Sequence, residues 1–219
     1  MLTGESPIKQ SATIYNGGAS NSVYVSPFHL DNQTTGQYKF LAFCGDFNTS
    51  VPSTFATQAV EYNAVAFSDI GELYTANQKN LINDLFGYAY GSAFGSDGSI
   101  INSVNAQAFQ LALWSILYET EDYDIMKGSF HLGTNYNSDV VNTTNSWLDA
   151  VTGNVSWSDI GLETFTKYDL TVYMPAGGVN ASQVLISVVG PPVVPEPATM
   201  LVVGLGLAGI GLTRRWKQK

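Results

Sequence analysis

The chain has 219 residues, with 9 Lys or Arg, 18 Asp or Glu and a formal net charge of −9 at pH 7. Nucleic-acid binding needs a concentrated basic surface, which such an acidic chain does not supply, so we expect no nucleic-acid partner. The single cysteine, Cys44, excludes an internal disulfide.

The opening third of the chain predicts β-strands. Short β-prone runs are separated by Gly, Asn and Asp, which are typical of turns. The predicted strands cover residues 12–15, 22–27 and 37–44.

The middle of the chain changes to a helical period. Residues 76–90 and 104–119 each place apolar side chains at helical spacing, and residues 142–151 predict a third helix. In the second helix, the side chains expected to face inward are Phe109, Leu113, Ile116 and Leu117.

Strands return at residues 167–174 and 183–189. Strands, then helices, then strands predict an α+β fold, an antiparallel sheet or sandwich with a small group of helices in the middle of the chain. We therefore expect one globular ectodomain over residues 1–189.

The C-terminal tail has three parts. Residues 190–197 form a Pro-rich spacer, residues 198–213 an apolar run, and residues 214–219 a basic end. The apolar run is shorter than the about 20 residues of an ordinary transmembrane helix, and we expect it to be a short one. The basic end would stay in the cytoplasm. Its charges are Arg214, Arg215, Lys217 and Lys219.

The order Pro195-Glu196-Pro197, short apolar helix and Arg-rich end resembles the PEP-CTERM sorting signal of Gram-negative bacteria that produce exopolysaccharide, also called an ice-binding-protein C-terminal motif. The resemblance implies an inner-membrane-anchored precursor, cleavage by exosortase near Pro195-Glu196-Pro197, and a mature protein at the cell surface or outside the cell. Residues 1–7 contain neither the charged nor the apolar region of a signal peptide, so we expect that segment to be missing from this chain.

Cys44 needs an explanation in an exported protein. It could be a small buried apolar residue, or it could have a partner other than sulfur. Phe43-Cys44 ends a predicted strand, and Gln110 lies in the very apolar run Phe109-Gln110-Leu111-Ala112-Leu113-Trp114.

This pairing resembles the thioester domains of bacterial surface adhesins. The resemblance implies that the Cys44 sulfur attacks the Gln110 side-chain amide, that ammonia leaves, and that an amine on the colonised surface later opens the thioester. Gly45-Asp46 departs from the hydrophobic and aromatic residues usual after the family's Cys. Asp46 would raise the pKa of the neighbouring thiol by like-charge repulsion.

A hydrolase could instead combine Cys44 with His29 or His131, but no local signature supports catalysis. We also expect no structural zinc site, because one Cys and two His are fewer than the four ligands that such a site uses. The acidic loops 119–124 and 97–99 lack the spacing of a calcium-binding EF-hand. We therefore expect no enzyme, no metal and no cofactor.

Two functional hypotheses follow from the sequence. In one, the ectodomain is an adhesion module that contacts exopolysaccharide or surface amines, with a reactive Cys44–Gln110 thioester. In the other, it is a non-reactive structural component of the exopolysaccharide or biofilm matrix.

Overall fold

The computed structural model describes residues 1–8, 10–33, 37–120, 122–153, 166–178 and 182–188. All of them belong to one compact unit, Met1–Val189. The strands are β1 (Leu2–Glu5), β2 (Ser11–Asn16), β3 (Ala19–Tyr24), β4 (Phe28–Asn32), β5 (Gln37–Cys44), β6 (Tyr62–Ala66), β7 (Phe130–Leu132), β8 (Leu170–Pro175) and β9 (Leu185–Val188). The helices are α1 (Ala76–Ala93), α2 (Ser103–Tyr118) and α3 (Ser138–Thr152), with a short 3-10 turn, η1 (Phe67–Asp69).

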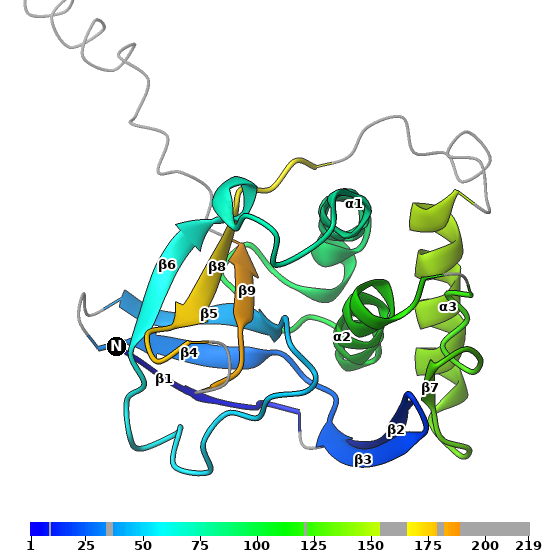
Figure 1. Ribbon diagram of the computed structural model, residues 1–219, viewed down its shortest axis with the longest axis horizontal. Helices are drawn as coiled ribbons and strands as arrows, with labels where there is room; N and C mark the ends of the chain where they lie inside the picture. Colours follow the sequence, from blue (N-terminus) through cyan, green and yellow to red (C-terminus); the bar gives the residue numbers. More distant parts are fainter. Residues whose placement is uncertain (9, 34–36, 121, 154–165, 179–181, 189–219) are drawn as a thin grey trace, which may run out of the picture. The chain divides into compact units, whose positions relative to one another are not determined.

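The strands form two antiparallel sheets. The larger sheet has the order β1-β4-β5-β9-β8-β6, and the smaller one has the order β3-β2-β7. Figure 1 shows the larger sheet on one side of the molecule and the three helices on the other. An antiparallel bridge between Leu2 and Val60 joins edge strand β1 to the segment just before β6, so the larger sheet curls on itself.

The two faces of strand β5 contribute to different apolar clusters, because side chains alternate along a strand. Phe43 packs against Phe86 and Phe109 of the helices, with ring centroids 5.5 and 4.8 Å apart. Ala42 belongs instead to a smaller cluster inside the curl of the sheet. That cluster is made of Leu2, Leu30, Ala42, Phe55 and Leu185. The strand that ends at Cys44 is thus held on both faces.

Helix α2 is the centre of the helical layer and contacts α1, α3 and β5. Every residue from Ala106 to Ile116 is buried, so this helix is apolar almost all round, as expected for a helix with neighbours on all sides. The polar exceptions inside this run are Gln107, Gln110 and Ser115. A buried polar side chain needs a hydrogen-bond partner, which makes Gln110 informative.

Local sequence signals fix the helix ends. Thr75 and Gln78 form a reciprocal capping box at the start of α1. The Asn102 side chain accepts bonds from two backbone N–H groups at the start of α2. Helix α3 begins at the cap Asn137 and ends at Gly153, whose φ of 81° suits glycine.

The predicted α+β class, antiparallel pairing and three helices are confirmed. The strand predicted at residues 22–27 is confirmed over residues 22–24 only, because β3 runs from Ala19 to Tyr24 and Val25-Ser26-Pro27 lead into β4. The sequence analysis also missed four strands, β1, β4, β6 and β7.

The helix face predicted for α2 is right at three of its four positions. Phe109, Leu113 and Ile116 are fully buried, but Leu117 is only half-buried and lines a pocket. Leu117 is the last residue but one of α2, which ends at Tyr118.

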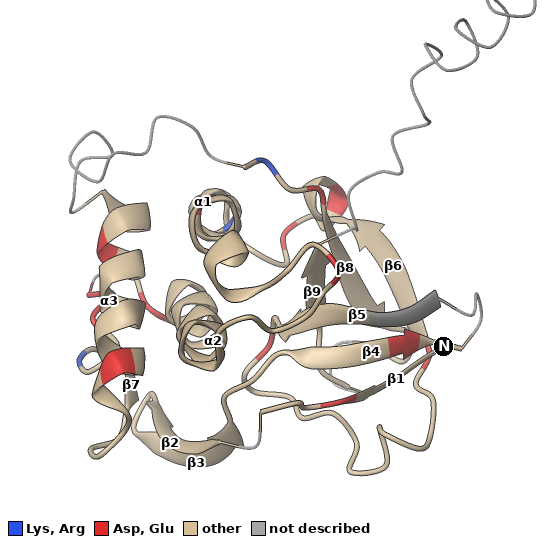
Figure 2. Cartoon of the chain, turned by 180° about the vertical axis from the view of Figure 1, so that it is seen from behind, with Lys and Arg blue, Asp and Glu red and all other residues tan. Residues whose placement is uncertain are grey.

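Figure 2 shows acidic residues distributed over both the helices and the sheet.

The predicted membrane helix over residues 198–213 lies outside the described residues. Among the residues that are described, no helix has the length and apolar character needed to cross a bilayer.

Candidate functional site

Cys44 and Gln110 are joined by two hydrogen bonds between the end of β5 and the middle of α2. The Gln110 Oε1 atom accepts from the Cys44 backbone N–H at 3.0 Å, and Gln110 Nε2 donates to the Cys44 carbonyl at 3.1 Å. Cys44 is 1% exposed and Gln110 is 0% exposed. The amide side chain therefore pairs with the strand much as a neighbouring peptide group would.

This arrangement fixes the Gln110 amide on the backbone of Cys44, where both residues are buried. On the other edge of β5, Cys44 is paired with Leu185 of β9, so the strand end is fixed from both sides. The Cys44 N–H is directed at the oxygen that would gain negative charge if the Gln110 carbonyl were attacked. A fixed donor at that position stabilises a tetrahedral intermediate.

The thiol of Cys44 is strongly held in its protonated form. Its Sγ atom donates to the backbone carbonyl of Asp46 at 3.1 Å. Burial raises the pKa of Cys44 to about 12, the indole of Trp114 opposes this shift, and the Asp46 charge adds to it. The effect expected of Asp46 is therefore present, but loss of hydration is the larger cause.

The Trp114 indole is itself buried next to this site. Its Nε1–H has no hydrogen-bond partner within the described part of the chain. The indole therefore lowers the pKa of Cys44 by its proximity and not through a well-formed hydrogen bond. Trp114 also packs edge-on against Phe47, with centroids 5.2 Å apart. Aromatic side chains thus enclose the region around Cys44 and exclude water from it.

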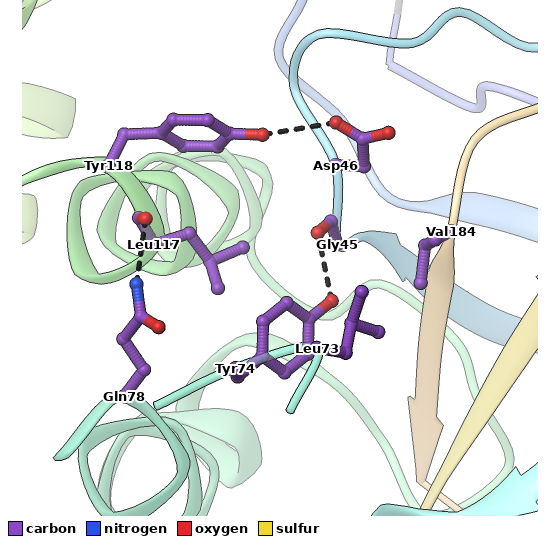
Figure 3. A pocket seen from close by; sticks show the side chains of 8 residues that line it. All are labelled: Gly45, Asp46, Leu73, Tyr74, Gln78, Leu117, Tyr118 and Val184. Carbon is purple, nitrogen blue, oxygen red and sulfur yellow. Dashed lines mark hydrogen bonds between the residues drawn. The ribbon is translucent and has the colours of Figure 1, made fainter. Parts of the chain in front are cut away.

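Two tyrosines that the sequence analysis did not single out contact the residues after Cys44. The Tyr74 hydroxyl donates to the Gly45 carbonyl at 2.8 Å, and the Tyr118 hydroxyl donates to Asp46 Oδ1 at 3.1 Å (Figure 3). Tyr118 also accepts from the backbone N–H of Phe47 at 2.9 Å. In the sequence, the only features that could have drawn attention to them are that Tyr74 lies just before a helix and Tyr118 lies at the end of another.

Packing explains why residue 45 is a glycine. A Cβ atom at this position would lie 2.5 Å from the Tyr74 hydroxyl and 3.1 Å from Ile186 Cγ1. Any side chain at residue 45 would therefore come too close to Tyr74, which fills the space beside Gly45.

The histidines of the hydrolase hypothesis have other surroundings. His131 stacks on Tyr15 in the small sheet with centroids 4.9 Å apart, and its Nδ1 lies 3.0 Å from the Gly128 carbonyl. His29 is in β4, opposite Glu5 of β1. The thiol of Cys44 bonds to a backbone carbonyl instead of an imidazole.

The acidic loops make local contacts. Asp97 accepts from the Ser99 backbone, and Asp124 forms an ion pair of 2.7 Å with Lys127. Among the residues that the structure describes, no three Asp, Glu, His or Cys side chains gather as metal ligands would. The buried carboxylate of Glu119 is used structurally, since it accepts from Ser129 Oγ and the Phe130 N–H and ties β7 to the end of α2.

The predicted sorting residues lie outside the described ranges. They are Pro195, Glu196, Pro197, Arg214, Arg215, Lys217 and Lys219. Sequence comparison, however, matches residues 193–215 to the PEP-CTERM protein-sorting motif. The tail carries a PEP-CTERM sorting motif. Such a motif is a signal recognised by exosortase, and it implies export of the chain before it.

Solved structures that resemble the chain include N-terminal domains of bacterial surface proteins. The N-terminal domain of the Streptococcus pyogenes pilus tip adhesin Cpa matches with a TM-score of 0.51 and 13% identity over 86% of this chain and 99% of that one. The N-terminal thioester domain of the S. pyogenes fibronectin-binding protein SfbI gives 0.48 and 15% over 84% and 95%. That of a Clostridium perfringens surface protein gives 0.46 and 12% over 81% and 98%.

At such low identity the likeness to the Cpa domain establishes the fold and nothing finer. Comparison with curated protein sequences gives no match. The roles of Cys44 and Gln110 are therefore argued from their own geometry.

Proposed function

We propose that this chain is an exported surface protein with a PEP-CTERM tail, whose ectodomain acts in adhesion through a thioester between Cys44 and Gln110. The observation that carries the proposal is the pairing of the Gln110 amide with both backbone groups of Cys44, at 3.0 and 3.1 Å. It fixes the Gln110 amide on the backbone of the residue that carries the one thiol of the sequence. The adhesin-like fold and the sorting motif agree with this role.

The thioester would form with the loss of one ammonia molecule. The Cys44 sulfur attacks the Gln110 Cδ carbon, the C–N bond of the amide breaks, and ammonia leaves with the proton of the thiol. The Cys44 N–H on Oε1 supports the charge that develops on oxygen. Because the thiol is protonated in its buried site, removal of its proton is the demanding step.

The same chemistry explains why the protein need not be an enzyme. Opening of the thioester by an amine leaves Gln110 joined to that amine through a stable amide, and Cys44 returns to a thiol. The reaction consumes the site, so each molecule reacts once. A covalent bond to a surface amine is an adhesive outcome without turnover.

Intact-mass measurement tests the bond. Wild-type protein should be lighter than its sequence by one ammonia, and methylamine should add to it. Cys44→Ser and Gln110→Ala should each show the mass of their own sequence and should not react. Wild-type protein at its full sequence mass, unchanged by methylamine, would contradict the thioester.

The alternative is a non-reactive component of the exopolysaccharide or biofilm matrix, and one observation favours it. The Gln110 amide already satisfies the N–H and C=O of Cys44 without any covalent bond, so the pair is also a complete structural device. In that case Cys44 keeps its thiol and the mass experiment shows no loss of ammonia.

We further propose that exosortase processes an inner-membrane-anchored precursor and releases the ectodomain to the cell surface or the medium. The match over residues 193–215 supports this route. Mature protein from wild-type cells should lack residues 214–219, whereas cells without exosortase should retain them. A Glu196→Ala chain, in which only the motif is changed, should also retain them; full-length protein in wild-type cells would count against processing.

A further inference from the structure

The indole of Trp114 carries a buried hydrogen-bond donor that has no acceptor. Trp114 is 3% exposed, and among the residues that the structure describes no atom accepts from its Nε1–H. A buried donor without a partner destabilises a fold, and native structures contain few of them. The unpartnered indole therefore requires an explanation.

The position of Trp114 on α2 brings its side chain to the end of β5. Trp114 follows Gln110 by four residues, so the two side chains lie on the same face of the helix. Gln110 is bonded to the backbone of Cys44 at 3.0 and 3.1 Å. One helical turn further on, the indole packs edge-on against Phe47, with ring centroids 5.2 Å apart. The indole therefore lies beside the chain that runs from Cys44 to Phe47.

The group on which the indole acts is the sulfur of Cys44. Burial raises the pKa of the Cys44 thiol to about 12, and the Trp114 indole opposes this shift. The Asp46 backbone also lowers this pKa, to a smaller extent, whereas the Asp46 charge raises it. The indole is thus the group near the sulfur that most favours its negatively charged form.

A neutral thiol makes little use of such a donor. The Cys44 Sγ atom donates its one proton to the Asp46 carbonyl at 3.1 Å, and the sulfur of a thiol is a weak acceptor. A thiolate is charged, and hydrogen bonds to ionised groups are about twice as strong as those between neutral ones. The indole N–H therefore gains a good partner only when charge develops on the sulfur.

We propose that the Nε1–H of Trp114 is a donor for the anionic sulfur of Cys44, used when the thioester forms and again when it opens. The inference rests on the proposed thioester and adds a residue to its chemistry. In this scheme the protein keeps an unpartnered donor in its neutral state because the donor is needed in the charged one.

Both steps pass through a sulfur that carries negative charge. During formation the thiol loses its proton, the sulfur bonds to Gln110 Cδ, the C–N bond breaks, and ammonia leaves with that proton. During opening by an amine, the nitrogen bonds to Cδ and the C–S bond breaks with its electron pair going to the sulfur. The sulfur then takes the surplus proton of the amine and becomes a thiol. Trp114 stabilises the sulfur before the bond is complete in the first step and after it breaks in the second.

The first test measures the rate at which methylamine opens the thioester, followed by intact mass. Trp114→Phe keeps an aromatic ring but lacks the N–H, and it should open about tenfold more slowly than wild type, as expected for loss of a hydrogen bond to a charged group. Trp147→Phe is the matched control, because Trp147 is also buried but packs on Phe109, and it should open at the wild-type rate. A smaller ring that only loosened the packing would admit methylamine and speed the reaction, so equal or faster opening of Trp114→Phe overturns the proposal.

An NMR measurement separates this inference from the thioester itself, and it also decides the case in which Trp114→Phe carries no thioester. It uses protein with a free thiol. This is wild type opened with methylamine or, if intact mass shows that no thioester forms and the proposed function fails, wild type as purified. As alkaline pH ionises Cys44, followed by the ultraviolet absorbance of the thiolate, the indole proton signal of Trp114 should move to lower field. The signal of Trp147 should stay in place, as should that of Trp114 in Cys44→Ser. A Trp114 signal that does not respond to ionisation of Cys44 overturns the proposal.

Discussion

The two sides of the β5–α2 contact differ in water access and charge. The Cys44–Gln110 pair is fully buried and neutral, and its amide is held by two hydrogen bonds. One residue further along the chain, Asp46 is half-buried, charged and bonded to Tyr118. The exposure of the chain to solvent thus increases from Cys44 to Asp46.

This difference suggests a division of labour. A thioester survives only where water is kept away, yet it is useful only where a nucleophile can arrive. The buried pair meets the first condition, and a pocket lined by Gly45 and Asp46 begins one residue further along the chain. The predictions below change the buried side, the pocket side or the boundary between them.

Removing the amide from the buried side should have the largest effect. Gln110→Ala leaves the N–H and C=O of Cys44 buried without partners, which costs about 1–3 kcal/mol of unfolding free energy for each group. Cys44→Ser is the matched variant, because it retains both backbone bonds and should cost much less in a protein without the thioester. Urea denaturation measures both; equal losses would instead point to a covalent link that both variants remove.

Alanine variants of Leu113 and Leu117 allow the stability of the two sides to be compared within one helix. Leu113 is 0% exposed, so Leu113→Ala should lower the unfolding free energy by about 2–5 kcal/mol, as for other buried leucines. Leu117 is half-buried at the pocket, and Leu117→Ala should cost clearly less. Similar losses in urea denaturation for both variants would show that the pocket wall is as tightly packed as the core.

The sequence predicted the helices well because their signals are local. The apolar spacing and the caps at Thr75, Asn102 and Asn137 lie within a few residues of each helix start. Strands β1, β6 and β7 were missed because they pair with strands distant in sequence, whereas β4 pairs with the next strand, β5, as well as with β1. Strand β6, for example, has mostly exposed side chains and is defined by its pairing with β8.

The candidate pair could be suggested from the sequence, but its surroundings could not. A lone cysteine and a glutamine in an apolar run are visible locally, and a family resemblance connects them. Nothing local indicates that Tyr74 fills the space beside Gly45, or that Tyr118 holds Asp46. These contacts join residues 29 and 72 positions apart, so only the tertiary fold brings them together.

A methyl group at the boundary between the two sides should have an intermediate effect. Gly45→Ala places Cβ 2.5 Å from the Tyr74 hydroxyl, and such overpacking typically costs about 1–3 kcal/mol. In a Tyr74→Phe background the hydroxyl is absent, so the same substitution should cost less. Thermal or urea unfolding of the four proteins in this cycle measures the coupling. Additive effects would mean that Tyr74 is not what excludes a side chain at residue 45.

An effect that is absent at neutral pH, and that separates a thiol from a thioester, appears at alkaline pH. Burial raises the Cys44 pKa from 9.0 to about 12, so between these values the unfolded chain loses the thiol proton and the folded chain keeps it. The unfolded state then binds fewer protons, and stability falls as pH rises, by at most about 1.4 kcal/mol per pH unit. Buried tyrosines shift stability in the same direction, but the difference between wild type and Cys44→Ser isolates the cysteine. A free thiol gives a difference that grows above pH 9, whereas a thioester has no proton to lose and gives a flat one. Wild-type protein first opened with methylamine should regain the slope, and a slope unaffected by methylamine would show that Cys44 was a thiol throughout.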